Sequence, residues 1–199
     1  MPTEERATKL IEPLSDTSGF VQHVRSLLEQ KLATKKVAMT TRYQGADVYM
    51  FGDRQNGYIT LVKDGEILYF VRHELVKHNR MQLGRQVLVW RNRHAANSAS
   101  SVGFASHVFF DYLLPKYHAL IADKEQSPDG KQFWEYALKR AFDLGKKAYF
   151  LNRRTTPNTL TQLHDFNDVI ANAHDLWGEE DGHLRTFAVI SDVPLKIKA

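Results

Sequence analysis

The sequence contains no cysteine among its 199 residues, which excludes disulfide bonds, thiolate zinc sites and cysteine nucleophiles together. This absence is typical of a reducing compartment, so we expect a cytoplasmic protein. Long apolar runs are also missing. The start of the sequence, 1–6, is polar and charged, with no apolar run behind it, which predicts neither a signal peptide nor a membrane-spanning segment.

A strong charge of one sign is absent as well, because 27 Lys and Arg stand against 23 Asp and Glu, for a net charge of +4. This excess permits contact with nucleic acid or another polyanion but does not by itself predict it. Hydrophobic residues (43%) and charged residues (25%) occur at ordinary globular frequencies. We expect a polar leader over 1–16 and a single domain over 17–199.

The first half of the sequence predicts one helix followed by antiparallel strands. Apolar residues recur at helical spacing over 20–28, and Lys35-Lys36 closes this helix. Asp64-Gly65 lies between two apolar runs, and a two-residue loop of this kind favours a type I′ hairpin turn. The expected strands cover 48–51, 58–62, 66–71 and 86–90.

The second half alternates helices and strands, which predicts the α/β class. A helix is expected from 102, ended by Leu114-Pro115 and buried through Val102, Ala105, Phe109 and Tyr112. Strands are expected over 117–122, 147–151 and 183–191. Further helices are expected over 127–144 and from Leu163 to near Gly178.

A polar stretch of small residues separates the strand at 86–90 from the helix that follows it. A helix N-terminus offers free N–H groups and about half a positive charge, and small residues let the backbone approach a phosphate. Arg91 and Arg93 supply cations, and Ser100, Ser101 and Gly103 supply small residues. The same stretch is equally compatible with a capped turn that binds nothing.

The order helix, antiparallel hairpins, strand, turn and helix, strand, helix, strand resembles that of the GNAT acyltransferase superfamily over about residues 17–191. The resemblance implies a mixed sheet of about six to seven strands flanked by helices. It also implies acetyl-CoA or another acyl-CoA, its pyrophosphate held by Arg91, Arg93, Ser100, Ser101 and Gly103. Of the family's loop glycines only Gly103 has a counterpart, and the loop is longer than the family pattern.

A second matching stretch lies in the helix over 127–144. The family pairs a small residue with an aromatic one four positions on, usually a tyrosine that protonates the departing thiolate. Here the pair is Gly130 and Trp134, and an indole carries no titratable proton. The resemblance therefore implies Trp134 as a cofactor contact and Tyr136 as the candidate acid, although Tyr136 is rotated about 200° from Trp134 on a helix.

Carboxylates follow the buried strand over 117–122, and functional groups collect beyond the carboxyl ends of strands in open α/β sheets. Asp123 or Glu125 is the candidate general base that removes a proton from an acceptor amine. Alternatively, Asp123 only organises the turn before Pro128. His164 and Asp168 have a spacing that suits a metal or an ion pair, but residues of this kind more often form a solvated helix face opposite the apolar stripe.

Two functions follow. The first is an acyl-CoA-dependent N-acyltransferase that acts on an amine of a protein, nucleic acid or small molecule. The second is a catalytically degenerate GNAT-like module that binds a host protein or nucleic acid, similar in its divergence to small phage-encoded proteins of this fold. Modification of a nucleic-acid base, as by the Mom-type DNA modifiers, would combine them. A basic face for such partners is expected from Arg85, Arg91, Arg93, Lys139, Arg140, Lys146, Lys147, Arg153 and Arg154.

Overall fold

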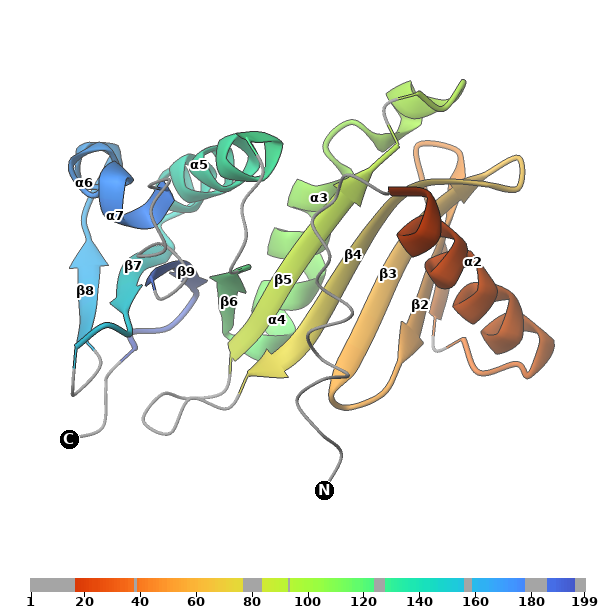
Figure 1. The fold of residues 1–199 in the computed structure, drawn as a ribbon, viewed down its shortest axis with the longest axis horizontal. Coiled ribbons are helices and arrows are strands. Elements are labelled where there is room, and N and C mark those ends of the chain that lie inside the picture. The colour runs from red at the N-terminus through yellow and green to blue at the C-terminus, as the bar shows by residue number, and fades with distance from the viewer. Residues whose placement is uncertain are drawn as a thin grey trace.

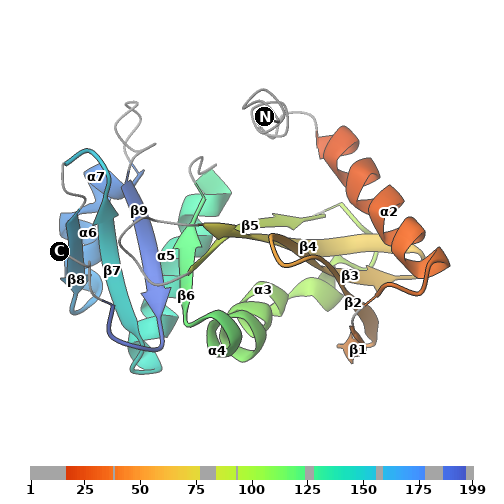
Figure 2. The same ribbon diagram turned by 90° about the horizontal axis from the view of Figure 1, so that it is seen from below.

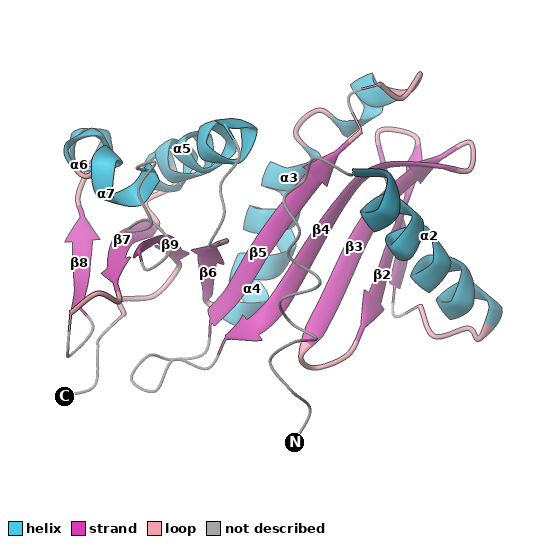
Figure 3. Ribbon diagram, in the orientation of Figure 1, coloured by secondary structure: helices cyan, strands magenta, loops and turns pink. Residues whose placement is uncertain are grey.

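The computed structural model describes residues 17–37, 39–76, 84–92, 94–123, 128–155, 159–177 and 186–195. They form one mixed sheet with the strand order β1-β2-β3-β4-β5-β6-β9-β7-β8, which runs across the whole molecule (Figures 1 and 3). The predicted α/β class is confirmed. The expected six to seven strands were too few, because the sheet has nine.

The strands are β1 (Met39–Tyr43), β2 (Ala46–Gly52), β3 (Asn56–Lys63), β4 (Glu66–Val76), β5 (Gly84–Arg91), β6 (Ala119–Ala122), β7 (Lys147–Asn152), β8 (Thr159–Leu163) and β9 (Thr186–Ser191). The helices are α2 (Thr17–Ala33), η1 (Ser98–Ser101), α3 (Phe104–His107), η2 (Val108–Leu113), α4 (Leu114–Tyr117), α5 (Pro128–Asp143), α6 (Phe166–Ala171) and α7 (Ala173–Trp177).

Tight hairpins build the first half of the sheet. Asp64 and Gly65 join β3 to β4 with φ values of 50° and 77°, which confirms the predicted type I′ turn. Gln44 and Gly45 join β1 to β2 with nearly the same values, 47° and 77°. The sequence analysis did not predict β1, because Gln-Gly is a weaker turn signal than Asp-Gly.

The second half of the sheet is built by crossovers. The only parallel pair among the described strands is β5 with β6, and β9 inserts between β6 and β7. The helix expected from Leu163 to near Gly178 is corrected at its start, because Leu163 ends the edge strand β8. The helical residues divide into α6 and α7, and α7 ends at Trp177. The reason is local, because the Asp165 side chain accepts from the backbone N–H groups of Asn167 and Asp168 and so starts a helix after Leu163.

A single helical segment, α3–η2–α4, follows β5 and extends beyond the predicted end at Leu114-Pro115. Pro115 is accommodated because it lies in the first turn of α4, where a missing N–H costs little, directly after the π-helical η2. The predicted buried face is also corrected at its start. Val102 precedes the segment and is exposed, whereas Phe104 is buried.

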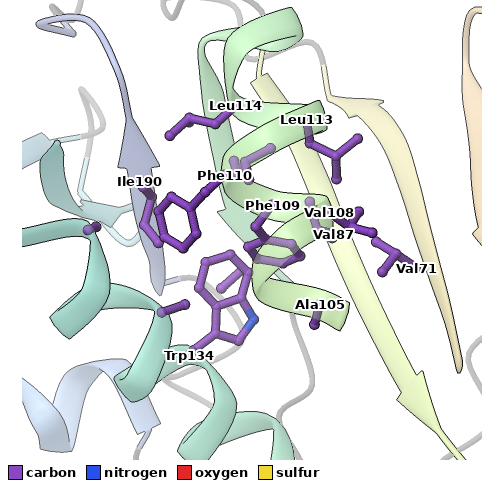
Figure 4. Close-up of a cluster of buried hydrophobic side chains, with 14 of the residues drawn as sticks. Val71, Val87, Ala105, Val108, Phe109, Phe110, Leu113, Leu114, Trp134 and Ile190 are labelled. Atoms are coloured by element: carbon purple, nitrogen blue, oxygen red, sulfur yellow. The ribbon is translucent and has the colours of Figure 1, made fainter. Parts of the chain in front are cut away.

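Helices cover the two faces of the sheet unequally, as Figure 2 shows. Helix α2 packs on one face of β2–β5 through Val24 and Leu28. The larger core lies on the opposite face, where α3–η2–α4 and α5 meet the sheet (Figure 4). None of the helices in the described ranges is both long and apolar enough to cross a membrane.

Candidate functional site

Strands β5 and β6 pair only briefly and then part. Their register joins Arg85 to Leu120, Gln86 to Ile121 and Val87 to Ala122. Beyond Val87, β5 continues to Arg91 while β6 ends, so this edge of β5 has no strand partner among the described residues (Figure 1). We call this point the β5–β6 fork. It lies at the carboxyl end of β6, and β5 runs past it in the same direction to Arg91. Ligands bind beyond the carboxyl ends of strands in open α/β sheets.

The expected phosphate turn follows β5 directly, and Arg91 organises it. The Arg91 Nε donates to Ser101 Oγ at 2.9 Å, and its guanidinium also donates to the Ser98 carbonyl oxygen at 3.3 Å. Ser101 Oγ in turn donates to the Ser98 carbonyl oxygen at 2.7 Å. The structure therefore brings Arg91 and Ser101 together, while Arg93 lies outside the described residues.

The tip of the β3–β4 hairpin also supports this turn. Lys63 Nζ donates to Ser100 Oγ at 3.1 Å, and the Asn97 amide donates to the Asp64 carboxylate at 3.0 Å. Lys63 is thus a second cation beside the serines, and it was not among the predicted site residues. No local signal could have identified it, because 37 residues separate Lys63 from Ser100.

Gly103 stands between the turn and α3 in the left-handed conformation, with φ 76°. A Cβ atom at this position would lie 2.9 Å from Tyr43 Oη. That hydroxyl donates to the Val102 carbonyl oxygen at 2.8 Å, so β1 holds the start of the helical segment. Glycine is therefore needed here both for its φ and for its lack of a side chain.

Asp123 is half-buried and directly follows Ala122, the last β6 residue paired with β5. The Gln86 amide donates to the Ala122 carbonyl oxygen at 3.2 Å and ties the two strands together just before Asp123. This places the candidate base at the β5–β6 fork. Glu125 lies outside the described residues.

The two aromatic candidates on α5 have opposite surroundings. Trp134 is only 1% exposed, and its ring lies 5.4 Å from that of Phe109, so this side chain belongs to the core between η2 and α5 (Figure 4). Tyr136 is 57% exposed. Their spacing of two residues puts them on different faces of α5, as the sequence analysis expected.

The other end of β5 is closed by a buried cation. Arg85 is 3% exposed and donates to the carbonyl oxygens of Gln55 and Arg54 at 2.7 and 2.8 Å. Its guanidinium also lies 4.3 Å from the centre of the Tyr117 ring. The expectation that Arg85 contributes to a basic face is therefore corrected, because this charge is enclosed.

His73 packs in the same region and is 6% exposed. Burial, together with the nearby positive charges of Arg85 and Lys116, lowers the pKa of His73 to about 3. The ring therefore stays neutral throughout the physiological pH range. It fills the space beside Gly57, where a Cβ atom would lie 2.2 Å from His73 Cε1.

Several members of the expected basic face already have partners. Arg140 lies over Phe110, Arg153 over Phe187, and Arg154 contacts the Asp175 carboxylate at 3.6 Å.

The predicted pair of His164 and Asp168 lies at the start of α6. The Asp168 carboxylate accepts from the backbone N–H of His164 at 2.7 Å. Asp168 therefore helps to fix the start of α6.

Comparison with known proteins does not assign a family. A scan against protein-family models finds no match, and a search of curated proteins finds none either. The function is therefore argued from the residues of the site.

Proposed function

We propose that the protein is an acyl-CoA-dependent N-acyltransferase with a GNAT-like arrangement. The observation that carries the proposal is the β5–β6 fork, with the Arg91-held serine turn beside it and a helical segment starting at Gly103. The order of elements supports the same arrangement, since a helix and hairpins precede β5, and a helical segment, β6, α5 and β7 follow it.

The residues of the turn suit a pyrophosphate. Arg91 is exposed, and the partners of its guanidinium within the described residues are neutral, a serine hydroxyl and a carbonyl oxygen. Lys63 Nζ likewise donates to a neutral hydroxyl. Both cations can exchange these partners for phosphate oxygens, which form stronger charge-assisted bonds. A bound acyl-CoA supplies the activated thioester, and Arg91, Lys63, Ser100, Ser101 and Gly103 hold its phosphates.

Asp123 supplies the base in this proposal. An amine attacks only after it loses its extra proton, and a carboxylate at the β5–β6 fork can accept that proton. The Tyr136 side chain is 57% exposed. Tyr136 can therefore protonate the departing thiolate only where that thiolate reaches the exposed face of α5. The acceptor is an amine of a protein, nucleic acid or small molecule.

One observation favours a second function. Trp134 stands where the family carries its acid, and it is enclosed in the core at 1% exposure. A chain that keeps the fold but lacks the proton donor can serve as a binding module for a host protein or nucleic acid. Lys139 on α5, with Lys146 and Lys147 after it, then provides part of the basic contact surface.

Calorimetric titration with acetyl-CoA tests the cofactor site that the acyltransferase requires. We expect a dissociation constant in the micromolar range, about −8 kcal/mol. Arg91→Met should weaken binding at least about tenfold, because it removes a charge-assisted contact worth about 1.5–3 kcal/mol. Arg42→Met is the matched control, since Arg42 is an exposed arginine on β1 paired with Asp47 at 3.3 Å.

The outcomes separate the two functions. Acyl transfer to an amine that is lost in Asp123→Asn, with binding retained, supports the enzyme. If the protein binds acetyl-CoA but transfers no acyl group to any amine tested, it is a degenerate module that still binds the cofactor. No heat and no thermal shift with acetyl-CoA would refute the acyltransferase, and salt-sensitive binding of DNA or RNA would then support the nucleic-acid module.

A further inference from the structure

A cavity of about 260 Å³ lies on the face of the sheet that α2 covers, opposite to the face that carries α3. Helix α2 forms one wall, and the end of the β2–β3 hairpin with β4 forms the other. Figure 2 shows α2 and α3 on opposite sides of the sheet. The lining residues are Leu27, Lys31, Phe51, Gly52, Asp53, Asn56, Tyr58 and Arg72.

The apolar part of this cavity, which we call the α2 cavity, is aromatic. Phe51 and Tyr58 are cross-strand partners, and their rings stack with centroids 5.3 Å apart and an angle of 10°. Phe51 is buried and Tyr58 is half-buried. Leu27 adds an aliphatic side chain from α2. An apolar group entering the cavity therefore meets a fixed aromatic surface.

The polar part carries one anion held in place by the backbone. Asp53 Oδ1 accepts from the backbone N–H groups of Gln55 and Asn56, both at 2.7 Å. These bonds lower the pKa of Asp53, so the carboxylate is ionised at neutral pH. They engage one oxygen, and Oδ2 is left for another donor. Gly52 fixes the approach to Asp53, because at φ 131° a Cβ atom would lie 2.2 Å from the Asn56 carbonyl oxygen.

The polar part also carries a cation on the wall formed by α2. Lys31 lies close enough to Asp53 to contribute to the lowering of its pKa, yet within the described ranges the two make no ion pair. The second cation, Arg72, is already bound to Glu74 at 2.6 Å. The α2 cavity thus presents separated charges of opposite sign, Lys31 and Asp53, beside an aromatic surface.

We propose that the α2 cavity binds a small zwitterion, an α-amino acid with an apolar side chain. Its carboxylate pairs with the Lys31 ammonium, its ammonium pairs with Asp53 Oδ2, and its side chain packs on Tyr58 and Leu27. A simple anion would satisfy Lys31 but bring a like charge to Asp53, and a simple amine would do the reverse. Only a ligand with both charges complements both walls. This site does not depend on acyl transfer at the β5–β6 fork.

An NMR titration of the full chain with three related probes tests whether the ligand needs both its carboxylate and its ammonium group. The probes are phenylalanine, phenethylamine, which lacks the carboxylate, and 3-phenylpropionate, which lacks the amine. We expect phenylalanine to bind with a dissociation constant of about 1 mM or tighter and each of the other two to bind about tenfold more weakly. No binding of phenylalanine, or equal binding of all three probes, would overturn the proposal.

Two variants assign each wall to its charge. Lys31→Met should weaken phenylalanine about tenfold and leave phenethylamine unchanged. Asp53→Asn should weaken phenylalanine and leave 3-phenylpropionate unchanged, and the Asn side-chain oxygen can still accept the two N–H groups that form the turn. Lys36→Met, an exposed lysine after α2, is the control and should change no affinity. If both wall variants bind all probes like the unaltered protein, the ligand does not lie in this cavity.

Discussion

Arg85 and Arg91 occupy the two ends of β5 and project to the same face of the sheet, yet their surroundings are opposite. Arg85 is 3% exposed and holds the β2–β3 turn and Tyr117. Arg91 is exposed and donates to Ser98 and Ser101 at the two ends of η1. The end of β5 at Arg85, which we call the closed end, pairs with β6. The end at Arg91, which we call the open end, lies beyond the β5–β6 fork.

The same residue type stabilises the fold at one end of β5, as Arg85, and is exposed to a ligand at the other, as Arg91. The partners of Arg85 are two carbonyl oxygens from a distant turn, and the Arg85 side chain is buried. The partners of Arg91 lie in the ten residues that follow it, and Arg91 is exposed. A rigid base below a more adaptable turn is a suitable support for a binding site.

Replacement of each arginine by methionine should give the largest difference between the two ends. Arg85→Met should reduce the free energy of unfolding by about 3 kcal/mol, because it removes two bonds from a charged donor at a buried position. Arg91→Met should reduce it by less than about 0.5 kcal/mol, as is usual for surface positions. Urea denaturation of the two variants measures both values. Equal losses would mean that the open end is as essential to the fold as the closed one.

At the closed end, the strand was predictable from the sequence, but the enclosure of Arg85 was not. The pattern of β5 predicted a strand, but nothing near Arg85 indicated that Arg54, Gln55 and Tyr117 would enclose its charge. The hairpin at Asp64-Gly65 was predictable because the turn is set by two adjacent residues. Arg85 was assigned to the surface because arginine is rarely buried, and only the tertiary contacts overrule that expectation.

The neutral His73 beside Arg85 should make the closed end sensitive to acid. Its folded pKa is about 3, below the ordinary value of 6.5, so the unfolded state binds the proton first and stability falls as the pH drops below 6.5. At pH 4.5 this amounts to roughly 2–3 kcal/mol relative to neutral pH, at about 1.36 kcal/mol per pH unit.

His73→Phe keeps a ring against Tyr117 but removes the titrating group. The difference between the unaltered protein and this variant, followed by urea denaturation from pH 7 to pH 4.5, isolates the His73 contribution from that of the carboxylates. Parallel pH profiles for the two proteins would show that His73 takes up its proton without unfolding.

The candidate site was predicted in part. The position of the serine turn after β5, with Arg91 next to it, followed from local sequence. The contribution of Lys63 and the support from Tyr43 did not, because both come from hairpins far away in the chain. For Trp134, the position in the sequence was predicted but the surroundings of the side chain were not. A motif spacing indicated its place on α5, but its burial depends on Phe109 in another helix.

At the open end, alanine substitutions should show that Gly103 is constrained more than an ordinary turn glycine. Gly45 and Gly103 have φ values of 77° and 76°, but a Cβ atom would meet nothing within 4 Å at Gly45 and would lie 2.9 Å from Tyr43 Oη at Gly103. Gly45→Ala should therefore cost only the left-handed conformation, about 1 kcal/mol. Gly103→Ala should cost about 2 kcal/mol, because the hydrogen bond from Tyr43 to Val102 must also shift.

A double-mutant cycle with Tyr43→Phe separates these two contributions to the Gly103→Ala effect. In the Tyr43→Phe background the hydroxyl is gone, so Gly103→Ala should cost about 1 kcal/mol, the same as Gly45→Ala. Thermal or urea unfolding of the four proteins of the cycle gives the coupling energy directly. If Gly103→Ala costs the same with and without the hydroxyl, the contact with Tyr43 does not constrain the turn.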